Sequence, residues 1–398
     1  AWADAQMPVL RRVGERFAKA RALDGLTVAC CLHVTAETAS LVQALRAGGA
    51  EVALCAANPL STQDEVAAAL DAEDGVEVHA ARGADLRAYT EGIAAVAART
   101  PALALDDGAD LIARLHDDGA TEGLIGATEE TTTGLVRLRS LDGAGGLRCP
   151  VIAVNEALAE RAFNDRHGTG QSTLDGILRA TNALLAGCTL VVIGYGWTGR
   201  GIAERARGAG ASVVVCEVDP VRALEARMQG YEVMTSLAAA EQGDVFVTVT
   251  GSRAVLGRAH FERMKDGAIL ANAGHFDVEI DLEALRAAAD GPGREVRPLV
   301  EQFEVGGRRL HLLAQGRVVN LAAAEGHPAA VMDLSFALHA LVVEALAREP
   351  GALAPGVHAV PAGIDREVAR LKLEALGVEI DVPTAEQESY RVSWGTAS

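Results

Sequence analysis

Short apolar runs and amphipathic segments alternate along the first 155 residues of the chain. Segments such as 37–50 and 85–99 place apolar residues at helical spacing. The apolar runs between such segments cover 26–35, 51–58, 76–81, 101–108, 123–130 and 149–155. Strands that alternate with helices are typical of a parallel sheet covered on both faces. This half of the chain therefore predicts a doubly wound α/β domain.

A second alternating unit begins near Thr173. A helix with one apolar stripe is expected at 173–186. Strands follow it at 189–193, 211–220, 244–251 and 267–274. The pattern then changes, and residues 296–321 predict a hairpin that turns at Gly306 and Gly307. A helix is expected from His327 to about Ala347, and the stretch 361–398 reads as one helix and a polar tail.

Polar side chains gather where the predicted strands of the first half end. They are His33, Thr35, Asn58, Ser61, Asp106, Asp107, Glu129, Glu130 and Asn155. Open parallel sheets bind ligands at the carboxyl ends of their strands, so this set predicts a site for a polar, uncharged or cationic substrate. For any one of these residues the alternative is a helix cap, a common role of Thr, Asn and Asp at such turns. A ligand site explains the whole set better.

A dinucleotide motif follows the strand at 189–193. Gly194, Gly196 and Gly199 form GxGxxG at the start of a helix, where they permit a tight turn, a close approach of pyrophosphate and close helix–strand packing. The helix N-terminus offers free N–H groups to phosphates. The next strand leads to Glu217, whose carboxylate suits the ribose hydroxyls of NAD and would repel the extra phosphate of NADP. We therefore predict NAD as cofactor; the alternative is that the glycines serve only a turn.

These patterns together predict an α/β protein with two Rossmann-like, doubly wound parallel-sheet domains and a short C-terminal tail. We expect a substrate-binding domain at 1–165, completed by about 330–358. A NAD-binding domain is expected at 170–326, and a C-terminal helix and tail at 359–398.

Composition and charge narrow the partners. A formal net charge of -18 argues against nucleic acid or anionic membrane, because both repel an acidic surface. No run approaches the roughly 20 apolar residues of a membrane span, and the N-terminus shows no basic-then-apolar leader. A cytoplasmic enzyme is therefore expected. The 6 cysteines form no CxxC pair and are expected to be buried free thiols, without a metal or a disulfide.

Several long strings resemble one known family. They are CLHVTAETASLVQAL, NPLSTQDEVAAAL, ATEETTTG, FNDRHGTGQSTLDGILRATN, GYGWTGRG, MKDGAILANAGHFDVEI and NLAAAEGHPAAVMDLSFA. In order and spacing they resemble S-adenosylhomocysteine hydrolase from residue 7 onward. GTGQST, GYGWTGRG and the terminal VEID, EQ and SW features resemble its archaeal and thermophile-type branch. The resemblance implies a homotetramer whose tail can reach a neighbour's cofactor, although the tail here lacks the lysine that many members carry.

The resemblance also implies a mechanism. Bound NAD oxidises the 3′-hydroxyl of an adenine nucleoside to a ketone, which acidifies the hydrogen on C4′. A base removes that hydrogen, and the 5′ substituent leaves. Water adds to the resulting 4′,5′-ene, and the stored hydride returns to C3′. Because the cofactor is regenerated in each turn, the family keeps it buried.

Site roles are carried over by position. The implied catalytic residues are Asp107, Glu130, Glu160, Asn164, Asp165 and His275. The implied substrate contacts are His33, Thr35, Glu37, Gln63 and His327. The implied cofactor contacts are Thr131, Thr132, Thr133, Gly194, Gly196, Trp197, Thr198, Gly199, Glu217, Thr250, Gly274 and Asn320. For the histidines, the alternative is an ordinary packing or surface position.

Three neighbouring positions depart from the family pattern. The family uses a lysine and an Asp-Asn pair beside the 3′ oxygen, and this chain has Glu160 and the reversed pair Asn164-Asp165. The arginine-rich composition would favour arginine, not a reversed charge. Arg161 stands next door, but one helical residue turns a side chain by about 100°, so only a backbone shift would bring it inward.

The altered centre changes the expected chemistry. A glutamate can act as a general base where its pKa is raised, but a carboxylate has the wrong charge to stabilise a 3′ oxyanion. Asp107, Glu130 and Glu160 together predict that at least one carboxyl is protonated.

Three functions remain in competition. The first is oxidation and elimination on a different nucleoside, such as loss of water from a 5′-hydroxymethyl-type carbon. The second is ordinary S-adenosylhomocysteine hydrolysis in a compensated site, and the third is an inactive NAD-binding homologue that regulates a partner. The retained nucleoside and cofactor residues count against the third function. The coordinated change of three neighbouring positions counts against the second, so we favour the first.

Overall fold

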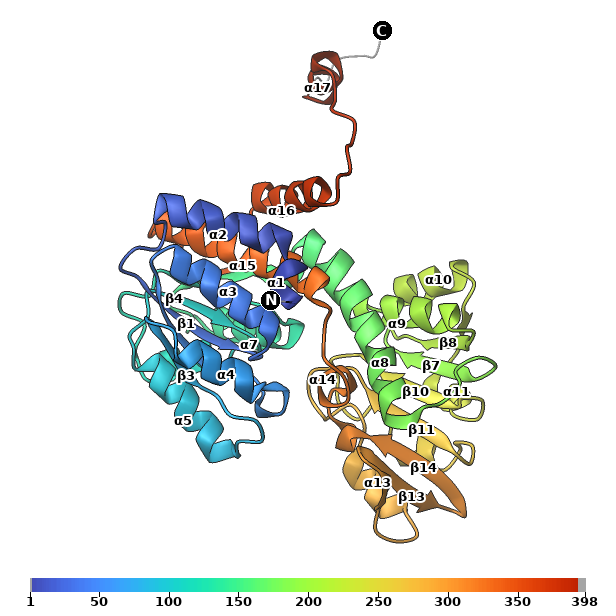
Figure 1. Cartoon of the computed structure of the whole chain (residues 1–398). Coiled ribbons are helices and arrows are strands. Elements are labelled where there is room, and N and C mark those ends of the chain that lie inside the picture. Colours follow the sequence, from blue (N-terminus) through green and yellow to red (C-terminus); the bar gives the residue numbers. More distant parts are fainter. Residues whose placement is uncertain (1, 393–398) are drawn as a thin grey trace.

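The computed structural model describes residues 2–392 and arranges them in two lobes, each built on one β-sheet (Figure 1). The first sheet is parallel throughout, as the alternating pattern predicts. Its strands in spatial order are β15 (Gly356–Ala359), β6 (Pro150–Ala153), β5 (Gly126–Glu129), β4 (Leu103–Asp106), β1 (Thr27–Leu32), β2 (Glu51–Ala56) and β3 (Val76–His79). The sequence pattern does not predict β15, which joins the edge of this sheet from far along the chain.

Helices cover both faces of the first sheet, and each face has its own apolar core. One face packs against α1 (Trp2–Ala5), α2 (Pro8–Ala20), α3 (Ala36–Ala47), α4 (Asp64–Asp71) and α15 (Ala329–Arg348). The other packs against α5 (Leu86–Ala97), α6 (Asp110–Asp117) and α7 (Thr132–Gly143). In α2, the buried residues Val9, Leu10, Val13 and Phe17 form one stripe. Burial on both faces explains why a strand such as β1 is apolar after its first residue, Thr27.

The second sheet is the predicted dinucleotide-type sheet with an antiparallel extension. Its strands in spatial order are β12 (Arg294–Arg297), β13 (Val300–Val305), β14 (Arg308–Leu313), β11 (Ala268–Asn272), β10 (Val245–Thr248), β7 (Thr189–Ile193), β8 (Ser212–Cys216) and β9 (Glu232–Val233). The predicted hairpin is confirmed, because β13 and β14 pair antiparallel across Gly306 and Gly307. The pattern does not predict β12, which pairs with β13 at the edge.

The helices of this lobe are mostly short. They are α8 (Gly170–Thr181), α9 (Trp197–Gly208), α10 (Pro220–Met228), α11 (Ser236–Ala239), α12 (Arg258–Phe261), α13 (Leu282–Ala288), η4 (Ala314–Gly316) and α14 (Val319–Ala322). Each face of this sheet again has its own apolar core. The lobe is therefore a second three-layer α/β unit.

A π-helix connects the lobes. The chain passes through η2 (Val154–Glu156) into η3 (Glu160–Thr169), a ten-residue π-helix that continues as α8. Such helices are rare and often lie at functional sites. Two glycines let this segment touch the backbone of α9, since a Cβ on Gly170 would lie 2.7 Å from the carbonyl carbon of Gly201. The π-helix is thereby fixed against the helix that follows GxGxxG.

The length and apolar character of α15 contradict the expectation that no run approaches the length of a membrane span. This helix is 20 residues long and apolar enough to cross a membrane by length and composition. In the fold, 78% of its most apolar window is buried against other parts of the protein. α15 is therefore the core helix of the first lobe, and its hydropathy reflects that position.

The C-terminal segment adds two helices. α16 (Ala362–Ala375) packs against α2 and α15, and α17 (Ala385–Val392) lies at the end of an extended stretch that leaves the body of the molecule (Figure 1). The sequence pattern predicts one helix here, so α17 is an addition to that prediction. Part of the tail signature, including Trp394, lies outside the described residues. Of the 6 cysteines, all free, five are buried as expected and Cys188 is partly exposed.

Candidate active site

Two kinds of acidic residue lie at the carboxyl edge of the first sheet. Asp106 and Glu129 are fully buried. Asp106 accepts two backbone N–H groups at 2.7 and 3.0 Å, and Glu129 accepts two more at 2.8 and 2.9 Å. Burial raises the pKa of Asp106 to about 7 and that of Glu129 well above its ordinary value. Because these two side chains organise loops, the ligand-facing candidates are their neighbours, Asp107 and Glu130.

Asp107 lies beside a histidine from another strand end. His33, which directly follows β1, places Nε2 3.4 Å from Oδ2 of Asp107. Its Nδ1 lies 2.5 Å from Oγ of Ser61, in the short helix η1 (Pro59–Ser61) that follows β2. The three groups come from loops after β1, β2 and β4, so the sheet itself sets their spacing. This is the arrangement that the polar strand ends predict.

Two histidines of the later part of the chain share this environment. Burial lowers the pKa of His275, which follows β11, and Asp107 opposes that shift. His327 lies just before α15, with Nε2 2.8 Å from Oγ1 of Thr169 in the π-helix. Burial, followed by the charge of His33, lowers the pKa of His327 to about 4. Both imidazoles are therefore neutral near neutral pH and can each donate and accept one hydrogen bond.

The π-helix places Glu160 in a closed polar network. Glu160 is 1% exposed, and its Oε2 accepts a hydrogen bond from Ser335 Oγ at 2.5 Å. Ser335 in turn accepts one from Asn164 Nδ2 at 2.7 Å. The same amide nitrogen lies 3.4 Å from Oε1 of Glu130. Two of the three altered positions therefore lie together beside Glu130.

Glu130 and Glu160 form a carboxyl pair. Burial and then repulsion by Asp107 raise the pKa of Glu130, whereas burial and then repulsion by Glu130 raise the pKa of Glu160. The hydrogen bond between them lowers the pKa of Glu130 and raises that of Glu160, so it favours the ionised form of Glu130 and the protonated form of Glu160. Because two adjacent buried carboxylates repel strongly, the pair retains one proton near neutral pH.

Arg161 does not occupy the place of the family's lysine. Its Nη2 lies 3.0 Å from Oε1 of Glu156, and 35% of its side chain is exposed. Burial raises the pKa of Asp165 to about 7, and Arg161 opposes that shift. The inward shift of Arg161 that the sequence leaves open is therefore absent. The chain's lysines are found elsewhere: Lys19 near the end of α2, and Lys265 and Lys372 in ion pairs outside this network.

Two residues of this network, Ser335 and His339, were missed by sequence reasoning. Both are fully buried on α15. They are four residues apart and so share one helical face, which is directed at Glu130 and Glu160. Two polar residues at this spacing on a mostly apolar helix are a signal that the sequence contains.

The GxGxxG turn is shaped for a pyrophosphate. Gly194 has a φ of +104°, and a Cβ on it would lie 2.6 Å from Val249 O. A Cβ on Gly199 would lie 2.0 Å from Gly194 O, so only glycine permits this packing. In contrast, the nearest atom to a Cβ on Gly196 would be 3.9 Å away, at Arg222. The backbone is therefore open at Gly196, where the motif requires a phosphate to approach.

Glu217 directly follows β8, and one of its bonds is to this turn. Its oxygens accept the N–H groups of Tyr195, Val218 and Asp219 at 2.7, 2.6 and 2.9 Å. A carboxylate has about four lone-pair sites, so this geometry fixes the group and leaves room for a ribose hydroxyl. Trp197 and Thr198 begin α9, with Arg200 5.0 Å above the Trp197 ring.

Asn320 is a buried residue of α14. It is 3% exposed, and Nδ2 donates to Ser172 Oγ at 3.2 Å. Its Oδ1 is buried without a hydrogen-bond partner. A buried amide oxygen without a partner is costly unless a ligand supplies a donor, and the carboxamide of nicotinamide is such a donor. The residues present therefore fit NAD at both ends.

The remaining predicted cofactor contacts, Thr250 and Gly274, lie against one buried carboxylate, that of Glu279. Thr250 donates to it through its backbone N–H and its hydroxyl, both at 2.8 Å. A Cβ on Gly274 would lie 2.0 Å from Oε1 of the same carboxylate. The sequence pattern does not predict this role for Glu279, although the residue lies within the GHFDVEI string.

The threonines predicted to contact the cofactor, Thr131, Thr132 and Thr133, lie at the start of α7, and two of them make hydrogen bonds within the protein. Thr131 caps α7 by accepting the N–H of Gly134 at 2.9 Å, and Thr132 donates to Asn155 at 2.8 Å. Thr133 is half-buried in the first turn of α7. The three therefore line the start of one helix, next to Glu130.

The proposed base and ribose contacts lie together near His33. Thr35 is the residue before α3, and Glu37 is in its first turn. Gln63 precedes α4, and its backbone N–H donates to Val34 O at 2.9 Å. The structure thus brings Thr35, Glu37 and Gln63 to one end of the sheet.

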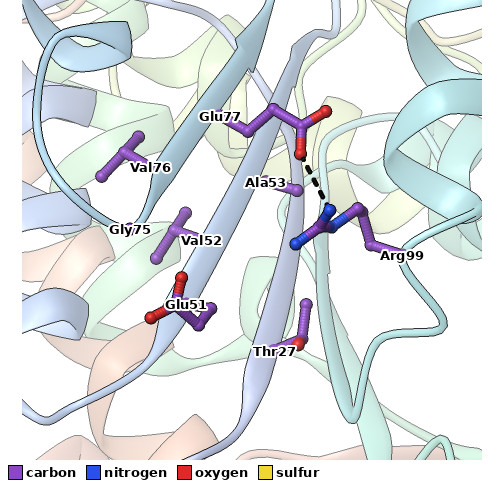
Figure 2. A pocket seen from close by; sticks show the side chains of 8 residues that line it. All are labelled: Thr27, Glu51, Val52, Ala53, Gly75, Val76, Glu77 and Arg99. Carbon is purple, nitrogen blue, oxygen red and sulfur yellow. Dashed lines mark ion pairs between the residues drawn. The ribbon is translucent and has the colours of Figure 1, made fainter.

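A separate hollow lies at the opposite edge of the first sheet (Figure 2). It is lined by the beginnings of β1, β2 and β3, and its ion pair joins Arg99 to Glu77 at 3.5 Å. Ligands of parallel sheets bind at the carboxyl ends of the strands, so this hollow is not the candidate site.

The fold and the site are those of a two-domain α/β protein of the class that binds a dinucleotide. Comparison with known proteins makes this specific. The profile of "S-adenosyl-L-homocysteine hydrolase, NAD binding domain" matches residues 165–326, and that of "S-adenosyl-L-homocysteine hydrolase" matches residues 1–125. The chain belongs to the S-adenosyl-L-homocysteine hydrolase family, and its cofactor is NAD.

Similar proteins span the whole chain. The adenosylhomocysteinase of Aquifex aeolicus is 55% identical over 99% of this chain and 94% of its own length. That of Aeropyrum pernix is 55% identical over 99% and 95%. The S-inosyl-L-homocysteine hydrolase of Methanopyrus kandleri is 54% identical over 99% and 93%. Among solved structures, the dipicolinate synthase A chain of Bacillus subtilis has a TM-score of 0.50 at 14% identity, covering 82% of this chain and 99% of its own, which concerns the fold alone.

Proposed function

We propose that this protein oxidises the 3′-hydroxyl of an adenine nucleoside transiently and eliminates the 5′ substituent across C4′ and C5′, with water as the leaving group. Such an enzyme is a nucleoside dehydratase. Its family membership supports NAD-dependent chemistry on a nucleoside. The observation that favours water is the buried carboxyl pair of Glu130 and Glu160. Burial raises the pKa of Glu160, and the described residues place no lysine in this network.

Water requires more help to leave than a thiol does. Hydroxide is far more basic than a thiolate, so its departure needs a proton donor. A buried carboxyl with a raised pKa is such a donor near neutral pH, as in other enzymes that keep an acid protonated by burial. Glu130 and Glu160 together hold one proton and one negative charge. This pair suits a reaction that both removes and delivers a proton.

Other side chains of the chain have separate tasks in this proposal. Gly194, Gly196, Glu217 and Asn320 would hold NAD, which would supply reversible hydride transfer at C3′. Neutral His275 and His327 are available to hydrogen-bond the sugar or to relay a proton. Asp107 and His33 lie 3.4 Å apart and orient each other beside the 5′ side of the nucleoside. Thr35, Glu37 and Gln63 bind the base and ribose.

A second candidate is hydrolysis of S-adenosylhomocysteine to adenosine and homocysteine. The similarity to adenosylhomocysteinases over 99% of the chain favours it directly. In that case the carboxyl pair compensates for the altered residues. One similar relative is named for an inosyl substrate, so adenine as the base is part of the proposal.

One experiment separates these candidates. Protein that carries NAD is mixed with adenosine, with a 5′-hydroxymethyl-type nucleoside or with S-adenosylhomocysteine. A rise at the absorbance band of NADH reports 3′ oxidation. An alkene product lighter by one water supports the dehydratase, whereas release of a free thiol supports the hydrolase. Absence of all three signals would contradict both and favour the inactive, regulatory homologue.

Assembly and location remain predictions from the resemblance. We propose a homotetramer in the cytoplasm. Sedimentation of the purified protein tests the assembly, and a monomer at micromolar concentration would contradict it.

A further inference from the structure

His339 is a buried histidine with both ring nitrogens in use. It lies in the middle of α15 and is 0% exposed. Nδ1 is 2.7 Å from Oγ1 of Thr128, a fully buried residue of β5. Nε2 is 2.6 Å from Oε2 of Glu130. A polar side chain at this depth, held at both ends, has a fixed orientation.

The direction of these hydrogen bonds follows from the proton count. Burial lowers the pKa of His339 to about 4, so the ring is neutral and has one N–H. Either the Thr128 hydroxyl donates to Nδ1 and Nε2–H donates to Glu130, or both directions are reversed. The reversed case requires Glu130 to be protonated. The amide nitrogen of Asn164, which can only donate, lies 3.4 Å from Oε1 of Glu130, and a hydrogen bond with Glu160 lowers the pKa of Glu130. Both favour an ionised Glu130 and therefore the first case.

We propose that His339 is a positioning residue: Thr128 fixes its tautomer, and its Nε2–H keeps Glu130 ionised so that the single proton of the carboxyl pair stays on Glu160. The proposal deepens and rests on the proposed function, in which this pair supplies one base and one acid. It explains how a polar network without the family's lysine holds a proton at a defined atom. Nothing in this role requires His339 to touch the substrate.

Other charged groups around the pair are accounted for. Asp107 after β4 and Asp165 on the π-helix both disfavour ionisation of Glu130, so they act against the effect of His339. Glu156 of η2 is paired with Arg161. The cations of α2 and α16 that reach α15, Arg16 and Lys372, are paired with Glu344 and Asp333. His339 is thus a hydrogen-bond donor to Glu130, and it opposes the effect of the two aspartates.

The first test is the pH dependence of cofactor reduction by a nucleoside. In His339→Leu the carboxylate of Glu130 loses a donor, so its ionised form is disfavoured. The acidic limb of the rate profile should move up by about one to two pH units, with a roughly 10-fold or greater loss of rate near neutrality. His339→Gln retains one donor and one acceptor and should restore most of the profile. A His339→Leu profile that matches the parent would overturn the proposal.

A matched control uses the same helix. Glu344 is a buried, ion-paired residue of α15 outside the site, so Glu344→Gln perturbs the helix without touching the carboxyl pair. Its unfolding temperature should change while its pH profile stays in place. If Glu344→Gln moved the profile as His339→Leu does, a general effect on α15 would replace our explanation.

The second test needs no activity. In NAD-loaded protein with ¹⁵N-labelled histidine, His339 should give the signals of a neutral ring protonated at Nε2, and Thr128→Val should reduce that preference. A ring protonated at Nδ1, or at both nitrogens, would refute the proposal. Should no nucleoside reduce the cofactor, the proposed function fails, while this spectrum still decides the role of His339.

Discussion

The cofactor region and the reaction region of this molecule are built by different means. Around Gly194 and Gly196 the surface consists of backbone, set by glycine packing and by Glu217, which bonds three N–H groups. The region around Glu130 and Glu160 consists instead of buried side chains, and burial raises the pKa of both carboxyls. The first region depends on shape, and the second on protonation. Substitutions in the first should therefore act at every pH, whereas those in the second should act through pH or charge.

The largest effect is expected from Gly199→Ala. The new Cβ would lie 2.0 Å from Gly194 O, a contact with backbone that side-chain movement does not relieve. We expect a loss of about 1–3 kcal/mol in unfolding free energy and loss of the bound NAD. Thermal unfolding and the nucleotide content of the purified protein measure both. Gly196→Ala is the control: the protein should fold normally and bind NAD more weakly. Retention of NAD by Gly199→Ala would break the shape argument.

The reaction region is tested by restoring the family's residues. Glu160→Lys combined with Asn164→Asp and Asp165→Asn supplies a cation for the 3′ oxyanion, an effect worth roughly 100-fold in comparable sites. Thiol release from S-adenosylhomocysteine should rise accordingly. Arg161→Lys, at a side chain paired with Glu156, should give no gain. An unchanged rate in the triple variant would mean that these positions do not cause the divergence.

Glu217→Ala sharpens the cofactor side of the comparison. Loss of hydrogen bonds from a charged acceptor to the ribose should weaken NAD binding by roughly 10–100-fold and reduce discrimination against NADP. Calorimetric titration of both nucleotides into cofactor-free protein measures this. Glu232→Ala, at an exposed position on the edge strand β9, is the control. Equal affinities for NAD in parent and Glu217→Ala would contradict the assigned role.

The smallest effect is expected at Asp165. Its pKa is raised to about 7 in the fold, so its favourable state is the protonated one. Stability is fully present below the pKa of the unfolded carboxyl and is lost as pH rises through about 7. Asp165→Asn should therefore raise the unfolding temperature near about pH 8 and leave it nearly unchanged near about pH 4. An equal effect at both pH values would show that Asp165 does not titrate with folding.

Much of the fold follows from local pattern. Continuous apolar strands, amphipathic helices and the GxGxxG turn predict both sheets and the hairpin at Gly306, because each depends on neighbouring residues. β15 was missed since its identity depends on pairing with β6, far away in the chain. The expectation that no run is long and apolar enough to span a membrane is wrong for α15. Hydropathy alone does not distinguish a core helix from a lipid-exposed one.

The site was predictable where residues sit at strand ends, as for His33 and Asp107. It was not predictable where function depends on proton sharing between distant segments. Ser335 and His339 lie more than 150 residues after Glu160 and 200 after Glu130 in the sequence, and only folding brings them together. Periodicity does not predict the π-helix either. The direction of a side chain on such a helix depends on its winding, so only the structure shows that Arg161 pairs with Glu156.

The most direct test is solvent exchange at C4′ of a bound nucleoside. NAD-loaded protein is incubated with adenosine in heavy water, and the H4′ resonance is followed together with absorbance at the NADH band. We predict that the band appears and that H4′ is replaced by deuterium, because a 3′ ketone acidifies that hydrogen. Retention of H4′, with no change in the cofactor, would contradict transient 3′ oxidation as the chemistry of this protein.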